Sequence, residues 1–251
     1  MPEDPIPRFL GYGVELAGAS VGFAVEFLQA VPAGAGGPIA VAATSVLKDI
    51  SVRFLSHREK ARVSAAGAFA IERIGDRLLA GYNPRSDDFF RELDNGNSSG
   101  KELLEAVLVK ARDSFEEKKV RHFGLFYANL VFADSVSAQT AHYSLRQLAR
   151  LTYRQLCLLA LVGRSGSLEV EALRRPTHDS LELESLKREE MDLHSSDLGT
   201  LGLLSPRGPW TDELSLLGKV LYDLAGLQYI DDDDKNAVAT AIASLTGKSI
   251  G

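Results

Sequence analysis

The chain has 251 residues, of which 45% are hydrophobic, and it carries a formal net charge of −6. This hydrophobic content excludes an intrinsically disordered protein, and the acidic balance disfavours non-specific nucleic-acid binding. The single cysteine excludes an internal disulfide, and the acidic, proline-rich start lacks the positive charge of a secretory signal, so we expect a cytoplasmic protein.

The first predicted domain, residues 1–56, is a hydrophobic, glycine-rich helical hairpin. Residues 9–31 are largely apolar and rich in small residues. Their only charges are Glu15 and Glu26, which lie eleven residues apart and therefore return to nearly the same face of a helix. Three glycines and two prolines in residues 32–38 break the helix before a second apolar run. So short a connection predicts two antiparallel helices.

Two environments suit this hairpin. Its first helix is long enough to span a bilayer, and Gly18 and Gly22 have the spacing by which membrane helices pack closely. However, Glu15 and Glu26 would be costly in lipid unless they paired or lined a pore, and close packing in a soluble core also explains the small residues. Burial in the resting state, followed by conditional insertion into a membrane, reconciles the two.

The second predicted domain, residues 57–150, is a helical bundle. Ser56 and Glu59 form a capping box that begins a helix, which residues 81–84 (Gly-Tyr-Asn-Pro) end. A polar loop is expected over residues 85–100.

A second capping box at residues 99–102 begins a long predicted helix. Its apolar stripe repeats at helical spacing and includes Phe115. The charged run 116–119 interrupts the stripe, so we expect a bend or an exposed turn there. Ser137 is expected to cap a further helix through Ala149.

The third predicted domain, residues 151–251, is winged-helix-like, with helices followed by a short β-wing and a terminal helix. The whole chain is therefore predicted to be predominantly α-helical. The expected elements of this domain are a helix from a third capping box at 152–155, a short helix over 168–173, a helix over 181–201, a wing that begins at 203–204, a helix over 215–227, and a last helix after the acidic run 231–234.

No arrangement of residues indicates catalysis, a metal or a cofactor. The five histidines lack partners at ligand spacing, and neither His-x-x-x-His nor Cys-x-x-Cys occurs. Cys157 lies on an apolar helix, where a buried, inert thiol is expected. We therefore expect a protein without enzymatic activity.

The winged-helix plan makes DNA binding an alternative function. The third helix of this plan, predicted over residues 181–201, carries many carboxylates as well as Lys187 and Arg188. The carboxylates would repel phosphates, so a protein contact or a structural role is favoured over DNA. The candidate patch for a nucleic acid or a partner comprises Arg146, Arg150, Arg154, Arg174, Arg175, Lys187 and Arg188.

Several segments resemble the helical abortive-infection alpha family of bacteria. They are Phe-Tyr-Ala-Asn-Leu at 126–130, Asp134, Ala-His at 141–142, residues 148–155, Leu158-Leu159, Leu-Gly-Leu-Leu at 201–204 and Leu-Gly-Lys at 217–219, and the similarity extends over about residues 103–226. The resemblance implies phage defence through growth arrest or death of the infected cell. It implies no catalytic residues.

Our leading hypothesis is a non-enzymatic antiphage effector of the abortive-infection type. In it, the helical body restrains the hydrophobic hairpin of residues 9–47 until a trigger, which must bind the two states with different affinity, releases it to the inner membrane. The expected partners are a membrane, a protein trigger and a second copy of the chain. The alternative is a winged-helix regulator that binds DNA or protein.

Overall fold

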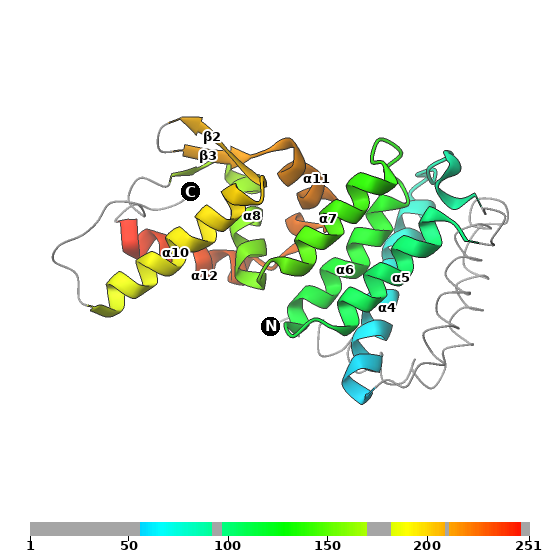
Figure 1. Ribbon diagram of the computed structural model, residues 1–251, viewed down its shortest axis with the longest axis horizontal. Helices are drawn as coiled ribbons and strands as arrows, with labels where there is room; N and C mark the ends of the chain where they lie inside the picture. The colour runs from blue at the N-terminus through cyan, green and yellow to red at the C-terminus, as the bar shows by residue number, and fades with distance from the viewer. Residues whose placement is uncertain (1–55, 92–96, 170–181, 209–210, 247–251) are drawn as a thin grey trace. The chain divides into compact units, whose positions relative to one another are not determined.

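The computed structural model describes residues 56–91, 97–169, 182–208 and 211–246, and the chain divides into two compact units, Met1–Ala149 and Arg150–Gly251 (Figure 1). The described residues form eight α-helices and one small antiparallel sheet, so the predicted, predominantly helical class is confirmed. The hairpin predicted for residues 1–56, with Glu15, Gly18, Gly22 and Glu26, lies outside the described residues except for Ser56.

The described part of the N-terminal unit contains three helices that pack on one another and a fourth that follows them. The helices are α4 (His57–Leu79), α5 (Ser99–Arg112), α6 (Glu117–Leu130) and α7 (Ala138–Arg150), and a short 3-10 turn, η1 (Asp88–Phe90), precedes α5. Figure 1 shows α4, α5 and α6 side by side. Their fully buried side chains include Ile74, Leu103, Phe123 and Phe126, which form the core of this unit.

Hydroxyl caps fix where these helices begin. The Ser56 capping box is confirmed, because the Glu59 N–H donates to Ser56 Oγ (3.3 Å) and the Ser56 N–H donates to Glu59 Oε2 (2.7 Å). The Ser137 cap is confirmed by a 3.1 Å bond from the Thr140 N–H to Ser137 Oγ. The box predicted at residues 99–102 is wrong by one residue.

The cap of α5 is Ser98, whose Oγ accepts a bond from the Lys101 N–H (3.2 Å). Glu102 instead accepts from Asn97 Nδ2 (2.9 Å), and the Asn97 side chain also accepts from the Ser98 N–H (3.0 Å). The preceding asparagine therefore stabilises the turn that makes Ser98, and not Ser99, the cap.

The bend or exposed turn expected at residues 116–119 is present but lies slightly earlier, and it divides the single long helix predicted after residue 99 into α5 and α6. The break lies between Asp113 and Glu116, where Ser114 Oγ donates to the Glu116 carbonyl (3.1 Å) and turns the chain. Phe115 lies on this turn and is 96% exposed, so its place in the predicted apolar stripe is wrong.

A close approach joins α4 to α6. An added Cβ at Gly124 of α6 would lie less than 3.0 Å from the Ala66 carbonyl oxygen and from Phe69 Cβ. The α4 residues around this point, from Ala65 to Ala70, are all buried, and most of them are small. Small residues on both helices thus let the two backbones meet.

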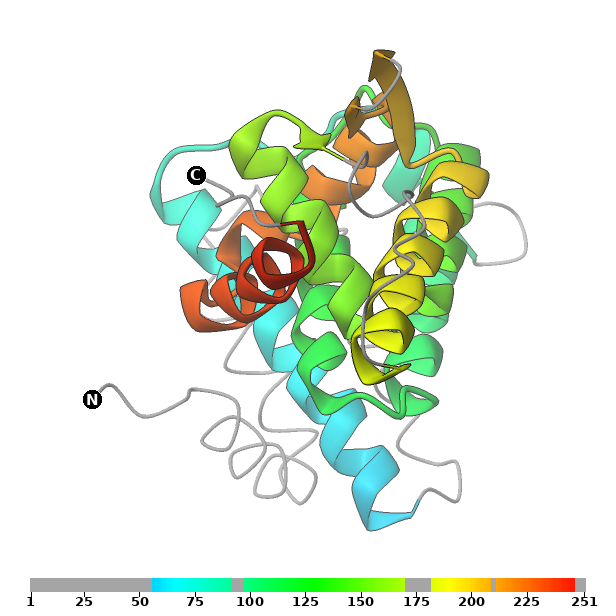
Figure 2. The ribbon, with the colours of Figure 1, turned by 90° about the vertical axis from the view of Figure 1, so that its left-hand side faces the viewer.

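In the C-terminal unit, the residues that the structure describes form four helices and a three-stranded antiparallel sheet of order β1-β3-β2. The last helix, red in Figure 2, packs against the first. The elements in chain order are α8 (Tyr153–Ser165), β1 (Leu168–Glu169), α10 (Glu182–Thr200), β2 (Leu204–Gly208), β3 (Thr211–Leu214), α11 (Leu216–Leu224), the 3-10 turn η2 (Leu227–Tyr229) and α12 (Asp232–Thr246).

Most predicted elements of this unit are present, with one clear error. The short helix expected over 168–173 is wrong where the structure describes it, because Leu168 and Glu169 form a strand that pairs with Asp212 and Thr211 of β3. The capping box of Thr152 and Gln155 is confirmed. Cys157 is buried, as predicted.

The start of β2 lies against the start of α11. The Ser215 N–H donates to the Leu203 carbonyl (3.0 Å), and Ser215 Oγ caps α11 by accepting from the Gly218 N–H (2.9 Å). A Cβ at Gly218 would come closer than 3.0 Å to the same Leu203 oxygen. A residue without a side chain is therefore required where the hairpin meets the helix.

Candidate interaction surface

The outward side of α10 presents acidic side chains around an exposed leucine. Met191, Ser195 and Leu198 recur at helical spacing and are buried, so the exposed residues of the helix lie on its opposite side. Leu193 is 62% exposed, which is unusual for a leucine in a folded helix. We call this surface the α10 face, defined by Glu189, Glu190, Leu193, Ser196 and Asp197.

The α10 face keeps its negative charge despite nearby polar partners. Glu190 Oε1 lies 3.1 Å from Arg154 Nη1 of α8 and 3.4 Å from His194 Nε2. Asp197 Oδ2 accepts a bond from Gln155 Nε2 (3.3 Å). These exposed pairs are weak, and only one of them brings a permanent cation, so the face remains acidic.

A second exposed surface lies on α7. The small or apolar residues Ala141, Leu145 and Leu148 are buried on one side of this helix. The opposite side carries an aromatic ring and two cations, with the Arg146 guanidinium carbon 5.0 Å from the centre of the Tyr143 ring. We call this surface the α7 face, defined by Gln139, His142, Tyr143, Arg146 and Arg150, which are all at least partly exposed.

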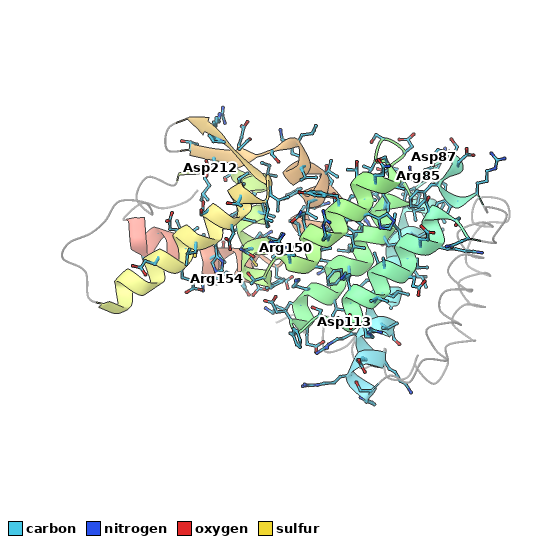
Figure 3. All side chains as sticks on the ribbon, in the orientation of Figure 1. Arg85, Asp87, Asp113, Arg150, Arg154 and Asp212 are labelled. Carbon is cyan, nitrogen blue, oxygen red and sulfur yellow. The ribbon has the colours of Figure 1, made fainter. Side chains whose placement is uncertain are left out.

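The basic patch predicted from the sequence is only partly assembled among the described side chains. Arg146 and Arg150 are four residues apart on α7, and neither forms an ion pair within the described residues. Arg154 belongs to α8, where it pairs with Glu190 (Figure 3). Arg174, Arg175 and the side chains of Lys187 and Arg188 lie outside the described residues.

A buried lysine donates a hydrogen bond to the C-terminal end of α7. Lys119 Nζ donates to the Ala149 carbonyl (3.1 Å), in the last turn of the helix, and lies 4.0 Å from Glu116 Oε2. Burial lowers the pKa of Lys119, whereas Glu116 raises it. A cation at this position satisfies a carbonyl at the negative end of the helix dipole. The sequence placed Lys119 in an exposed charged run, and the structure corrects that position.

Tyr153, Cys157 and Asp234 are titratable residues that interact in the C-terminal unit. The Tyr153 hydroxyl donates to Asp234 Oδ2 (2.9 Å), and burial, with smaller contributions from Cys157 and Asp234, raises the pKa of Tyr153. Cys157 is 2% exposed. A phenol with a raised pKa and a thiol closed to solvent lack the features of an activated nucleophile.

Two searches of the described residues give negative findings. Within these ranges, no three histidine, cysteine, aspartate or glutamate side chains gather closely enough to hold a metal ion. No described helix combines the length and the apolar character needed to cross a bilayer.

Comparison with known proteins finds no matching family model, no matching curated protein and no matching solved structure.

Sequence reasoning missed two features of these surfaces. They are the exposure of Leu193, within the helix predicted over residues 181–201, and the position of Tyr143 on the α7 face. Helical periodicity alone assigns every leucine to a buried stripe, so it cannot identify a leucine that points outward. The spacing of Tyr143, Arg146 and Arg150 at i, i+3 and i+7 was a usable signal for a shared face.

Proposed function

We propose that this protein acts by binding and not by catalysis, as an antiphage-defence effector whose C-terminal unit is a protein-binding winged helix. The element order supports the winged-helix plan: α8, β1, then α10 and the β2–β3 hairpin, with β1 pairing beside β3. In DNA-binding proteins built on a helix-turn-helix, one helix is presented to the partner, and α10 has the corresponding place before the wing.

The chemistry of the α10 face carries this proposal. A helix that reads DNA presents arginine, lysine and amide side chains to bases and phosphates. The described outward residues of α10 instead include Glu189, Glu190 and Asp197, with Leu193 exposed among them. An apolar side chain with a charged rim is typical of a protein–protein contact.

The defence role rests on the resemblance to the abortive-infection alpha family. Two of the segments that carry it, residues 201–204 and 217–219, meet where the Leu203 carbonyl lies against Gly218. This contact gives both segments a shared structural role, which supports treating them as one feature of a fold.

Replacing Leu193 by glutamine is expected to abolish protection against phage in cells that express the protein. The substitution removes the exposed apolar centre of the α10 face without opening a cavity, so the fold should persist. Plating efficiency of a phage panel measures the protection. Leu79→Gln is the matched control, because Leu79 is 81% exposed at the end of α4 and should tolerate the change.

Full protection by Leu193→Gln, with normal expression and circular dichroism, would reject the α10 face as the binding surface. Absence of protection by the parent chain would reject the defence role.

Fluorescence anisotropy with a labelled DNA duplex tests the alternative function, and it should show no binding at low salt. Strong binding that weakens steeply with salt would favour a DNA-binding regulator instead.

A second candidate function, membrane action by residues 9–47, is favoured by the position of Phe115. The turn that carries Phe115 lies beside the start of α4, because Arg62 Nη1 donates to the Arg112 carbonyl (3.2 Å) and Arg62 pairs with Glu117 at 2.8 Å. The hydrophobic segment precedes α4 in the sequence, and α4 begins at this end. Segments that bind at a membrane surface place Trp, Phe and Leu side chains at the boundary between the headgroups and the acyl chains.

The full chain is then expected to release dye from vesicles of phosphatidylethanolamine and phosphatidylglycerol. A chain that begins at Ser56 should release none, because it lacks the hydrophobic segment, and Phe115→Ser should release less than the parent. Equal release by the shortened chain, or none from the full chain, would exclude membrane action.

A further inference from the structure

The α7 face and the α10 face carry opposite charges. Arg146 and Arg150 are exposed on the first and form no ion pair within the described residues. Glu189 on the second is exposed and has no partner in the same part of the chain. Guanidinium groups bind carboxylates in a paired, directional geometry, so the α7 face selects an acidic surface.

The two faces also match in length and in apolar content. Tyr143 and Arg150 are seven residues apart, about 10 Å along a helix, whereas Glu189 and Asp197 are eight apart, about 12 Å. Each face has one partly exposed apolar group beside its charges, Tyr143 on α7 and Leu193 on α10. Two crossed helices could therefore bring the charges together around a shared apolar contact.

An acidic protein surface fits the α7 face better than a nucleic acid does. Much of the affinity for a nucleic acid comes from the counterions that are released when many phosphates are neutralised. Two arginines neutralise few phosphates and would therefore contribute little affinity. The whole chain has a net charge of −6, which repels a polyanion at long range. A local acidic face can pair with two arginines without a basic field around them.

We infer that the α7 face binds the α10 face of a second copy of this chain. The inference rests on the proposed role of the α10 face as a protein-binding surface and names its partner. Because each copy carries both faces, the contact can be made twice, from α7 to α10 and back. We expect this reciprocal exchange to give a two-fold dimer in which neither face is free.

Charge reversal on the two faces tests the inference. Sedimentation equilibrium of the parent should give a mass of two 27.2 kDa chains. The variants Arg146→Glu/Arg150→Glu and Glu189→Arg/Asp197→Arg should each dimerise with a dissociation constant about ten-fold higher than that of the parent, because like charges then face one another. An equimolar mixture of the two variants should restore the dimer, since every contact in a mixed pair again joins opposite charges.

The control is Arg58→Glu/Lys60→Glu, which makes the same change in net charge on two exposed residues at the start of α4 and should leave the dimer intact. A mass of one chain for the parent, or a mixture that stays monomeric, would overturn the inference. The inference would also be overturned if the parent bound a DNA duplex in a salt-sensitive way and Arg146→Glu/Arg150→Glu abolished that binding, because the α7 face would then bind nucleic acid. If the parent is monomeric while Leu193→Gln still loses phage protection, the inference fails and the proposed function stands.

Discussion

Gly124→Ala is expected to lower the free energy of unfolding of the N-terminal unit by about 2 kcal/mol. The added Cβ would meet the Ala66 carbonyl oxygen and Phe69 Cβ at less than 3.0 Å, and the Ala70 nitrogen at 3.1 Å. Two of these three atoms belong to the α4 backbone, so no rotamer change relieves the clash. Overpacking costs up to about 3 kcal/mol, and the better helix propensity of alanine returns about 1 kcal/mol.

Gly75→Ala is the matched control for this prediction. Gly75 also lies inside a helix, α4, but an added Cβ there meets nothing within 4 Å. Only the helix propensity changes, so this variant should gain up to about 1 kcal/mol. Urea unfolding followed by circular dichroism measures both variants. Equal stability of the two would show that α4 and α6 do not meet at Gly124.

Gly218→Ala is expected to destabilise the C-terminal unit by about 2 kcal/mol, because its Cβ would overlap the Leu203 carbonyl oxygen. That oxygen also accepts the 3.0 Å bond from the Ser215 N–H. To make room, α11 must move away from the start of β2, and this bond is lost. The unpaired carbonyl adds to the steric cost.

Gly199→Ala provides the comparison within the same unit, because Gly199 lies in α10 with nothing within 4 Å of an added Cβ. It should not lower stability. Hydrogen exchange locates each effect: Gly124→Ala should accelerate exchange in α4 and α6, whereas Gly218→Ala should accelerate it in β2, β3 and α11. Uniform acceleration throughout either variant would contradict the assignment of these contacts.

The sequence predicted those parts of the fold that depend on neighbours along the chain. The capping boxes at Ser56 and Thr152 are recognisable because both partners lie within three residues of each other. The strand at Leu168 and Glu169 was missed because the strand with which it pairs, β3, is more than forty residues away. The charged run 116–119 indicated an interruption, but helical periodicity could not place the break at Asp113–Glu116 or show that Phe115 lies on it, because a serine hydroxyl makes that turn.

The candidate surfaces show the same distinction: positions shared on one helix could be predicted, whereas pairings between two helices could not. Arg146 and Arg150 share a face because one helix carries both, and their spacing alone predicts this. Arg154 was grouped with them, but it pairs with Glu190, thirty-six residues further along the chain. Such a pairing depends on how α8 packs against α10, which composition and periodicity do not encode.

The burial of Lys119 makes its amine a reporter for the detachment of α7. While Nζ is bonded to the Ala149 carbonyl, its side chain is closed to solvent and to acylating reagents in solution. Labelling at this lysine requires α7 to leave α6, even briefly. Its labelling rate, read by mass spectrometry, would therefore measure how often the helix that carries Arg146 opens.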